Sequence, residues 1–201
     1  MAAQGRTGWS LTLANTDGGA IMTFRRVYSQ ADIATVSRLA CEIWNEYYVS
    51  IIGQAQVDYM LERFQSQPAI RDQIDSGAEY YLIIHQRKAV GYVGVVPEPT
   101  TASLLLSKIY VRKQSRGLRL GKLALGFTEE LCRQRNIRTI WLTVNKQNKE
   151  SIAWYERMGF TSPGPTIQDI GDGFVMDDFK FEKSVDHPGD LGIRLPQKKQ
   201  K

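Results

Sequence analysis

The stretch that decides the fold is SKIYVRKQSRGLRLGKLALGFTEEL, residues 107–131. It begins as an apolar run typical of a strand, passes through a basic turn with two glycines, and continues with apolar residues at helical spacing. The apolar positions of that helix face are Leu120, Leu123, Ala124, Phe127 and Leu131. The order strand, basic glycine turn, helix is therefore the central unit of the predicted fold.

The turn from Arg116 to Lys122 has features of a phosphate-binding site. A helix N-terminus leaves backbone N–H groups unpaired and carries a partial positive charge, so it attracts anions. Gly117 and Gly121 lack a Cβ, so the backbone there can approach an anion closely and adopt dihedral angles closed to other residues. The basic side chains of the turn add charge. A loop with solvated charges has the same composition, so the turn alone does not decide between the two interpretations.

The segments before this unit predict strands and helices with definite ends. MTFRRVY, residues 22–28, predicts a strand, and Ser29 begins a capping signature for the helix that follows. A second helix must stop or kink near Pro68. EYYLIIH and AVGYVGVV predict a hairpin, which Pro97 and Pro99 end.

The segments after the unit complete an α/β pattern. IRTIWLTVN predicts a strand, and NKESIAWYERMGF, residues 148–160, predicts a short helix that Asn148 caps and Gly159 closes. Residues 161–168 and 173–182 predict a final strand pair. The chain therefore alternates strands and helices to its last apolar segment.

Length and composition predict one domain. With 201 residues, 42% of them apolar, the chain can bury one sizeable core. We expect a flexible leader or tag at 1–21, the domain at 22–183, and a polar basic tail at 184–201.

Composition also disfavours several classes of protein. The formal net charge of +5 suits an anionic ligand. Cys41 and Cys132 lie in apolar helical stretches, which predicts buried, reduced thiols rather than a disulfide framework. His85 and His187 are the only histidines, so we predict no metal site. No apolar run approaches the ~20 residues that span a bilayer, and we expect a cytoplasmic protein without a membrane partner.

Tyr155 is a second candidate for chemistry. It shares a predicted helix face with Ile152 and Gly159. An aromatic side chain at helical spacing is usually a core residue, so Tyr155 alone predicts little.

The conjunction of these segments is more specific. SKIYV, then RGLRLG, WLTVN and NKESIAWYERMGF, in this order and spacing, resemble the GCN5-related N-acetyltransferase (GNAT) family over residues 104–160. The resemblance implies a single α/β domain with a mixed, mostly antiparallel sheet of six or seven strands flanked by helices. It also implies acetyl-CoA as co-substrate and an amine as acetyl acceptor.

The turn departs from the family at one position. The family's pyrophosphate signature is Gln or Arg, two residues, Gly, one residue, then Gly or Ala. Arg116 and Gly121 fit this signature, whereas Arg119 occupies the place of the middle glycine. Because Arg119 has a Cβ, either its backbone stays in the ordinary helical region or the pyrophosphate is displaced.

The resemblance also implies roles for individual residues. Backbone groups of Ile109 to Val111 would pair with the pantetheine arm, Gly117 to Lys122 would hold the pyrophosphate, and Asn148 would contact the coenzyme. Tyr155 would lie near the thioester sulfur as general acid. The coenzyme-binding residues expected in this way are Ile109, Tyr110, Val111, Arg116, Gly117, Leu118, Arg119, Leu120, Gly121, Lys122 and Asn148.

The sequence does not contain the usual general base. Many relatives place a glutamate on the central strand, where this chain has Ser107. Glu98, acting through a water molecule, is one candidate, and bulk water is the alternative. We expect direct transfer to the amine, with a strand N–H near Ile109 stabilising the oxyanion.

The acceptor is predicted on less specific features. Within the family the chain looks most like bacterial polyamine and diamine acetyltransferases, and carboxylates on the first two helices would meet a polyamine's charge. These carboxylates are Glu42, Glu46, Asp58 and Glu62. Helix-face carboxylates are ordinarily only solvated.

Other functions stay open at this stage. The chain can be a protein N-terminal or lysine acetyltransferase, or a coenzyme-binding module without turnover. Nucleic-acid binding is disfavoured because no recognised motif organises the basic residues. The sequence leaves open whether the chain forms a homodimer.

Overall fold

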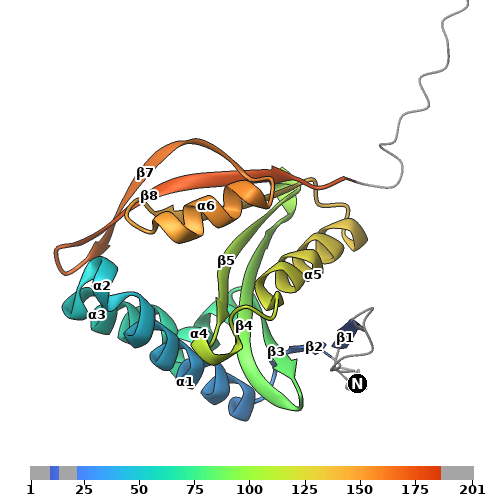
Figure 1. Cartoon of the computed structure of the whole chain (residues 1–201), viewed down its shortest axis with the longest axis horizontal. Coiled ribbons are helices and arrows are strands. Elements are labelled where there is room, and N and C mark those ends of the chain that lie inside the picture. Colours follow the sequence, from blue (N-terminus) through green and yellow to red (C-terminus); the bar gives the residue numbers. More distant parts are fainter. Residues whose placement is uncertain (1–9, 14–21, 187–201) are drawn as a thin grey trace, which may run out of the picture.

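The computed structural model describes residues 10–13 and 22–186. Its helices and strands follow one another largely in the order that the sequence predicts (Figure 1). In chain order they are β1 (Ser10–Leu13), β2 (Met22–Arg26), α1 (Gln30–Tyr47), α2 (Val49–Ile52), α3 (Gln54–Gln65), α4 (Gln67–Asp75), β3 (Glu79–His85), β4 (Lys88–Glu98), β5 (Ser103–Val111), α5 (Leu120–Gln134), β6 (Thr139–Asn145), α6 (Lys149–Arg157), β7 (Thr161–Gly171) and β8 (Phe174–Ser184).

All of these strands join one sheet in the order β1-β2-β3-β4-β5-β6-β8-β7. Every neighbouring pair is antiparallel except β5 and β6, which confirms the mixed, mostly antiparallel sheet. The sheet has one strand more than the six or seven expected. The extra strand, β1, lies in the segment 1–21 that the sequence analysis left out of the fold, and it pairs with the open edge of β2.

Local capping chemistry explains where the first helices begin. The Ser29 side chain accepts a hydrogen bond from the Asp32 N–H, and the Asp32 carboxylate accepts one from the Ser29 N–H. This reciprocal capping box satisfies two free N–H groups at the start of α1. Ser66 caps α4 in a similar way, with Pro68 in the first turn, so the predicted break between α3 and α4 is confirmed.

Two apolar cores cover the two faces of the sheet. Helices α5 and α6 pack with Phe24, Leu142 and Phe181 on one face. Helices α1, α3 and α4 pack with Tyr80, Leu82 and Tyr92 on the other. Figure 1 shows α1 to α4 gathered on one side of the central strands and α5 on the other. This arrangement leaves the ends of β5 and β6 as the place where both layers meet.

The central feature is the separation of β5 from β6. They pair in parallel over only three positions, from Ser103 opposite Thr139 to Leu105 opposite Trp141. After Leu105, β5 continues to Val111, and after Trp141, β6 continues to Asn145. Over these segments the two strands no longer pair with each other. The carboxyl ends of two parallel strands therefore diverge, which in α/β proteins is where ligands bind.

Some expectations for individual residues were wrong. Pro97 lies inside β4 opposite Leu104, and Pro99 begins the 3₁₀ turn that follows. Pro97 is tolerated because β3 starts opposite Val95, so this part of β4 has one neighbouring strand.

The two cysteines differ in exposure. Cys132 is buried, but Cys41 is exposed because it lies outside the apolar stripe of α1.

The predicted tail begins at the last residue of β8, and residues 187–201 lie outside the described part of the chain. Within residues 10–13 and 22–186, no helix combines the length and apolar character needed to cross a membrane.

Candidate active site

A continuous cleft of about 1540 Å³ opens between the diverging ends of β5 and β6. Its floor is β5, one wall is α6 with the β7–β8 hairpin, and the other wall is α1 with α3. The turn before α5 closes one end. Most of the residues singled out from the sequence therefore line one space.

The turn before α5 presents unpaired backbone donors. Arg119 is the N-cap residue of α5, and its side chain makes no capping hydrogen bond. The first hydrogen bond of the helix runs from the Leu123 N–H to the Arg119 carbonyl, 3.1 Å. The N–H groups of Leu120, Gly121 and Lys122 have no acceptor among the described residues. Helices α2, α3 and α5 have no side-chain cap, in contrast to α1, α4 and α6, and the first residues of α5 line the cleft.

The backbone of the turn is left-handed at two residues. Gly117 has φ 85°, as expected for a glycine with this use. Arg119 has φ 58° and ψ 14°. The alternative in which Arg119 keeps ordinary helical dihedral angles is therefore wrong, and the arginine takes the conformation that a glycine would adopt freely.

Gly121 is notable for its contact with α6 and not for its dihedral angles. It has no positive φ, contrary to expectation. A Cβ at this position would lie 3.4 Å from the Trp154 ring. This is an ordinary van der Waals distance, so the first turn of α5 lies beside Trp154 of α6.

Arg116 belongs to the turn but does not contribute a free charge. Its guanidinium pairs with Glu46 of α1 at 2.6 Å, donates to the Val111 carbonyl at 3.1 Å, and lies over the Tyr47 ring. Arg116 therefore ties the turn to α1 and β5. Arg119 and Lys122 are exposed and make no ion pair with a described residue.

The β5 strand carries a bulge in the floor of the cleft. Gly94 pairs with Lys108 and Val95 with Leu106, so Ser107 is an extra residue on β5. Ile109, Tyr110 and Val111 follow the bulge and line the cleft where β6 no longer pairs with β5. Their edge is open to a ligand that pairs with main-chain groups, as the resemblance implies.

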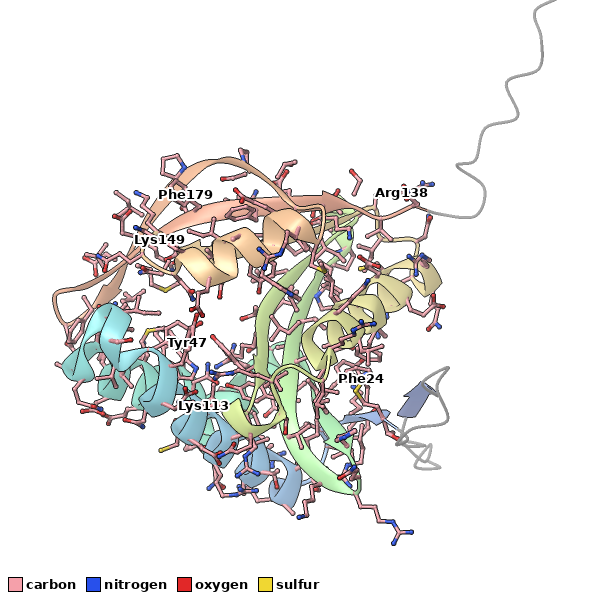
Figure 2. All side chains as sticks on the ribbon, viewed as in Figure 1. Phe24, Tyr47, Lys113, Arg138, Lys149 and Phe179 are labelled. Carbon is pink, nitrogen blue, oxygen red and sulfur yellow. The ribbon has the colours of Figure 1, made fainter. Side chains whose placement is uncertain are left out.

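Asn148 connects two walls of the cleft. Its Oδ1 accepts a hydrogen bond from the Ser151 N–H at 3.2 Å, which confirms the predicted cap of α6. The same oxygen accepts one from the Tyr47 hydroxyl of α1 at 2.9 Å. Figure 2 places Tyr47 in the gap between α1 and α6. A role of Asn148 in coenzyme binding stays a prediction.

Tyr155 lines the cleft from α6 and is 7% exposed. Its ring packs against Trp154, Phe160 and Phe181. Its hydroxyl has no hydrogen-bond partner within the described part of the chain. Burial, together with the neighbouring Tyr48, raises the pKa of Tyr155 well above its ordinary value, so the phenol keeps its proton. A phenol that stays protonated in a cleft can donate a hydrogen bond to a group that becomes negatively charged.

Asp178 is a site residue that the sequence analysis missed. It lies on β8 opposite Asn145 of β6, lines the cleft and is only 4% exposed. Burial raises the pKa of its carboxyl, against a hydrogen bond from Thr143 that lowers it. Asp178 also helps to raise the pKa of Tyr48 to about 12, behind the larger effect of burial. In the sequence, Asp178 is one of several acidic residues in a predicted strand. The pairing of β8 with β6 decides that its side chain faces the cleft.

The carboxylates expected on the acceptor side do not line the cleft. This set is Glu42, Glu46, Asp58 and Glu62. Glu42 forms a bidentate ion pair with Arg112, and Glu46 pairs with Arg116. Glu98, the candidate base, also lies outside the cleft lining. Hydrogen bonds from Ser103 and Trp141 hold the pKa of Glu98 below its ordinary value.

Comparison with known proteins identifies the family. The sequence model described as Acetyltransferase (GNAT) family matches residues 39–160, more than half of the chain. The chain belongs to the GNAT family. The matched segment runs from α1 through α6 and so includes the β5–α5 turn, the open edge of β5 and Tyr155.

Among curated proteins, the chain is similar to the 5-NmdU N-acetyltransferase of Pseudomonas phage PaMx11. The two are 30% identical over 92 residues, which is 46% of this chain and 62% of the relative. The chain thus spans less than two thirds of the length of this relative.

Solved structures with the same fold include two GNAT proteins from microorganisms. The PaiA N-acetyltransferase of Thermoplasma acidophilum, in complex with coenzyme A, has a TM-score of 0.63 at 19% identity, over 80% of this chain and 98% of its own. Mutant forms of the spermidine/spermine N-acetyltransferase SpeG of Vibrio cholerae have a TM-score of 0.58 at 16% identity, over 82% of this chain and 94% of their own. These likenesses confirm the α/β acyltransferase fold.

Proposed function

We propose that this chain transfers the acetyl group of acetyl-CoA directly to a primary amine of a small molecule. The single observation that carries the proposal is that one cleft contains three features. These are the unpaired edge of β5, the uncapped N-terminus of α5 and Tyr155. A long ligand with amides and a diphosphate needs the first two features. Membership in the GNAT family supports the same activity.

The residues present fit acetyl-CoA. The free N–H groups of Leu120, Gly121 and Lys122 point from a helix N-terminus, where a diphosphate is bound by donors and by the helix dipole. The side chains of Arg119 and Lys122 add charge that no described carboxylate neutralises. The open edge from Ile109 to Val111 suits the amides of the pantetheine arm.

Catalysis in this arrangement requires positioning and two proton movements. Holding an amine against a thioester removes ~7–11 kcal/mol of a bimolecular barrier without a covalent enzyme intermediate. A backbone N–H beside the bulge at Ser107 would donate to the carbonyl oxygen as negative charge develops, an interaction worth ~2.7–4 kcal/mol. We assign to Tyr155 the hydrogen bond to the leaving sulfur.

Asp178 supplies the base that the central strand lacks. An ammonium must lose a proton before its nitrogen attacks, and a buried carboxylate in the cleft both attracts the ammonium and accepts its proton. Glu98 is unsuited to this role because it lies outside the cleft lining and its carboxylate accepts hydrogen bonds from Thr101, Ser103 and Trp141. Asp178 is the buried carboxylate in the described part of the cleft.

Several classes of amine are candidate acceptors. Similarity in fold to SpeG keeps polyamines among the candidates, but the carboxylates predicted to bind them lie elsewhere. The name of the phage relative adds 5-NmdU to the candidates. A protein N-terminal or lysine acceptor, a cytoplasmic location and a homodimer also stay predictions.

The test has two parts. Titration calorimetry measures binding of acetyl-CoA, and release of free thiol measures transfer to a panel of amino acids, polyamines, peptides and 5-NmdU. We expect micromolar binding, in the usual range of roughly 1 μM–1 mM for enzyme substrates, and amine-dependent thiol release. Binding without release across the panel would favour a coenzyme-binding module, and absence of binding by folded protein would refute the proposal.

A further inference from the structure

Lys108 is a buried cation in the floor of the cleft that the proposed reaction does not use. It lies on β5 directly after the bulge, is 8% exposed and lines the cleft. Its aliphatic chain packs over Gly94, where a Cβ would lie 3.2 Å from it. Its ammonium donates to Gln73 Oε1 and to Ser107 Oγ, both at 3.0 Å.

No carboxylate neutralises this ammonium. Lys108 forms no ion pair with any of the residues that the structure describes, and its two hydrogen-bond acceptors, Gln73 and Ser107, are neutral. Its ammonium lies 5.3 Å from the centroid of the Tyr80 ring. Burial raises the pKa of the nearby Tyr80 and Tyr92 phenols, so they carry no charge. Burial also lowers the pKa of Lys108 to about 8, so the ammonium form still predominates at neutral pH.

The Gln73 oxygen that Lys108 uses as an acceptor is shared with a second donor. The Tyr80 hydroxyl also donates to Gln73 Oε1, at 2.7 Å, so this oxygen already serves two donors. The Tyr92 hydroxyl donates to Gln65 Oε1. An ammonium has three N–H bonds, and two of those of Lys108 are used. A buried charge with an unused donor is costly unless another oxygen completes its coordination.

We propose that Lys108 forms an acceptor subsite for amines that carry a carboxylate or carbonyl oxygen close to the reacting nitrogen. The inference rests on the proposed function and adds a substrate class to it. The oxygen would take the third N–H of Lys108, while the amine of the same molecule lies toward Asp178. A polyamine is disfavoured, because its second ammonium would meet Lys108 without a carboxylate between them.

Matched acceptors test the subsite. β-Alanine and β-alaninamide carry the oxygen, and ethylamine has the same amine without it. For the wild-type chain we expect kcat/KM to be at least about tenfold higher for the first two, as a hydrogen bond to a charged group predicts. Lys108→Met should abolish this preference and leave kcat/KM for ethylamine within about twofold. Lys88→Met, at an exposed lysine of β4, is the matched control and should change neither value.

Several outcomes would overturn the inference. An equal loss for all three acceptors in Lys108→Met would indicate a general role in catalysis, and spermidine as the best wild-type acceptor would contradict the charge argument. Ligand-observed NMR of propionate with the coenzyme A complex needs no turnover. Binding by wild type but not by Lys108→Met or Lys108→Gln is expected, and equal binding by all three would refute the subsite. Acetyl-CoA binding by the same proteins separates this failure from failure of the proposed function.

Discussion

Tyr155 and Asp178 reach the cleft from different elements, α6 and β8, and both are buried. Burial shifts the two groups in ways that suit opposite tasks. The phenol is held in its protonated form, whereas the carboxylate keeps a raised pKa that makes it a stronger base. Two groups whose environments separate their pKa values are a common arrangement for acid and base.

Tyr155→Phe tests the acid. Removing the hydroxyl should lower kcat by roughly 10²-fold, the lower end of a general acid's contribution, while the dissociation constant of acetyl-CoA changes little. The ring contacts with Trp154 and Phe160 are retained, so the melting temperature should stay close to that of wild type. Steady-state kinetics and calorimetry measure the two effects. Unchanged turnover would remove Tyr155 from this role.

Asp178→Asn tests the base and carries a stability signature. Burial raises the pKa of Asp178 in the folded protein above that in the unfolded chain, ~3.9. Above this pH the unfolded chain loses the proton more easily, so Asp178 destabilises the fold. At lower pH the carboxyl is protonated in both the folded and the unfolded protein, and this effect disappears. The variant should therefore be more stable than wild type at pH 7, with the difference vanishing near pH 3.5. Turnover should fall by roughly 10²-fold.

Thermal unfolding at several pH values and stopped-time assays measure both quantities. Asp177→Asn is a matched control, because Asp177 is exposed and pairs with Lys146. A variant of Asp178 that is less stable at pH 7 yet fully active would contradict the assignment.

At the scale of elements, the backbone conformation at the start of α5 costs free energy for the residue found there, Arg119. Its N-cap, Arg119, is left-handed, a conformation that costs a residue with a Cβ ~1–2 kcal/mol. Side-chain capping is absent there, as it is in α2 and α3, whereas α1, α4 and α6 have it. Both features leave N–H groups open, which indicates that α5 starts in a form suited to an anion rather than to its own stability.

Arg119→Gly tests this interpretation. Relief of the left-handed strain should exceed the entropy cost of the glycine, so we expect unfolding free energy to rise by about 0.5–1 kcal/mol. Arg119→Ala removes the same charge but keeps the Cβ, so it should not show this gain. If charge aids binding, both variants should weaken acetyl-CoA binding by a similar factor. Denaturant titration and calorimetry give these values, and equal stability of the two variants would argue against strain.

At the scale of the whole molecule, the cleft is closed by contacts between distant segments. The β7–β8 hairpin reaches α3, as Figure 1 shows, where the Tyr59 hydroxyl donates to the Ile170 carbonyl and Gln56 donates to the Val175 carbonyl. Asn148 and Tyr47 join α6 to α1 on the other side. The wall of the cleft that we propose for the acceptor therefore depends on contacts between the β7–β8 hairpin and α3, which are distant in sequence.

Tyr59→Phe tests the hairpin. Loss of one hydrogen bond should lower unfolding free energy by about 0.5–1.5 kcal/mol and loosen the acceptor wall. KM for the amine should rise several-fold, while acetyl-CoA affinity stays unchanged because the turn before α5 is untouched. Tyr28→Phe is the control, because the Tyr28 ring lies beside Arg26 of β2 and not at the hairpin. A larger effect on coenzyme binding than on the amine would contradict this division of the cleft.

The sequence by itself determined the features that depend on near neighbours in the chain. The caps at Ser29 and Asn148, the break before Pro68, and the strand–turn–helix unit around Gly117 all follow from local backbone and capping chemistry. Together with the family resemblance, these were enough for the fold class and for many of the residues that line the cleft.

Only the tertiary structure decided which side chains face that cleft. Strand periodicity leaves two possible faces for Asp178, and pairing of β8 with β6 selects the inner one. Glu42 and Glu46 form ion pairs with arginines and do not line the cleft. Lys108 lies buried beside the bulge at Ser107. Each outcome depends on partners distant in sequence, and the free energy of burying a charge is set by those partners rather than by its neighbours along the chain.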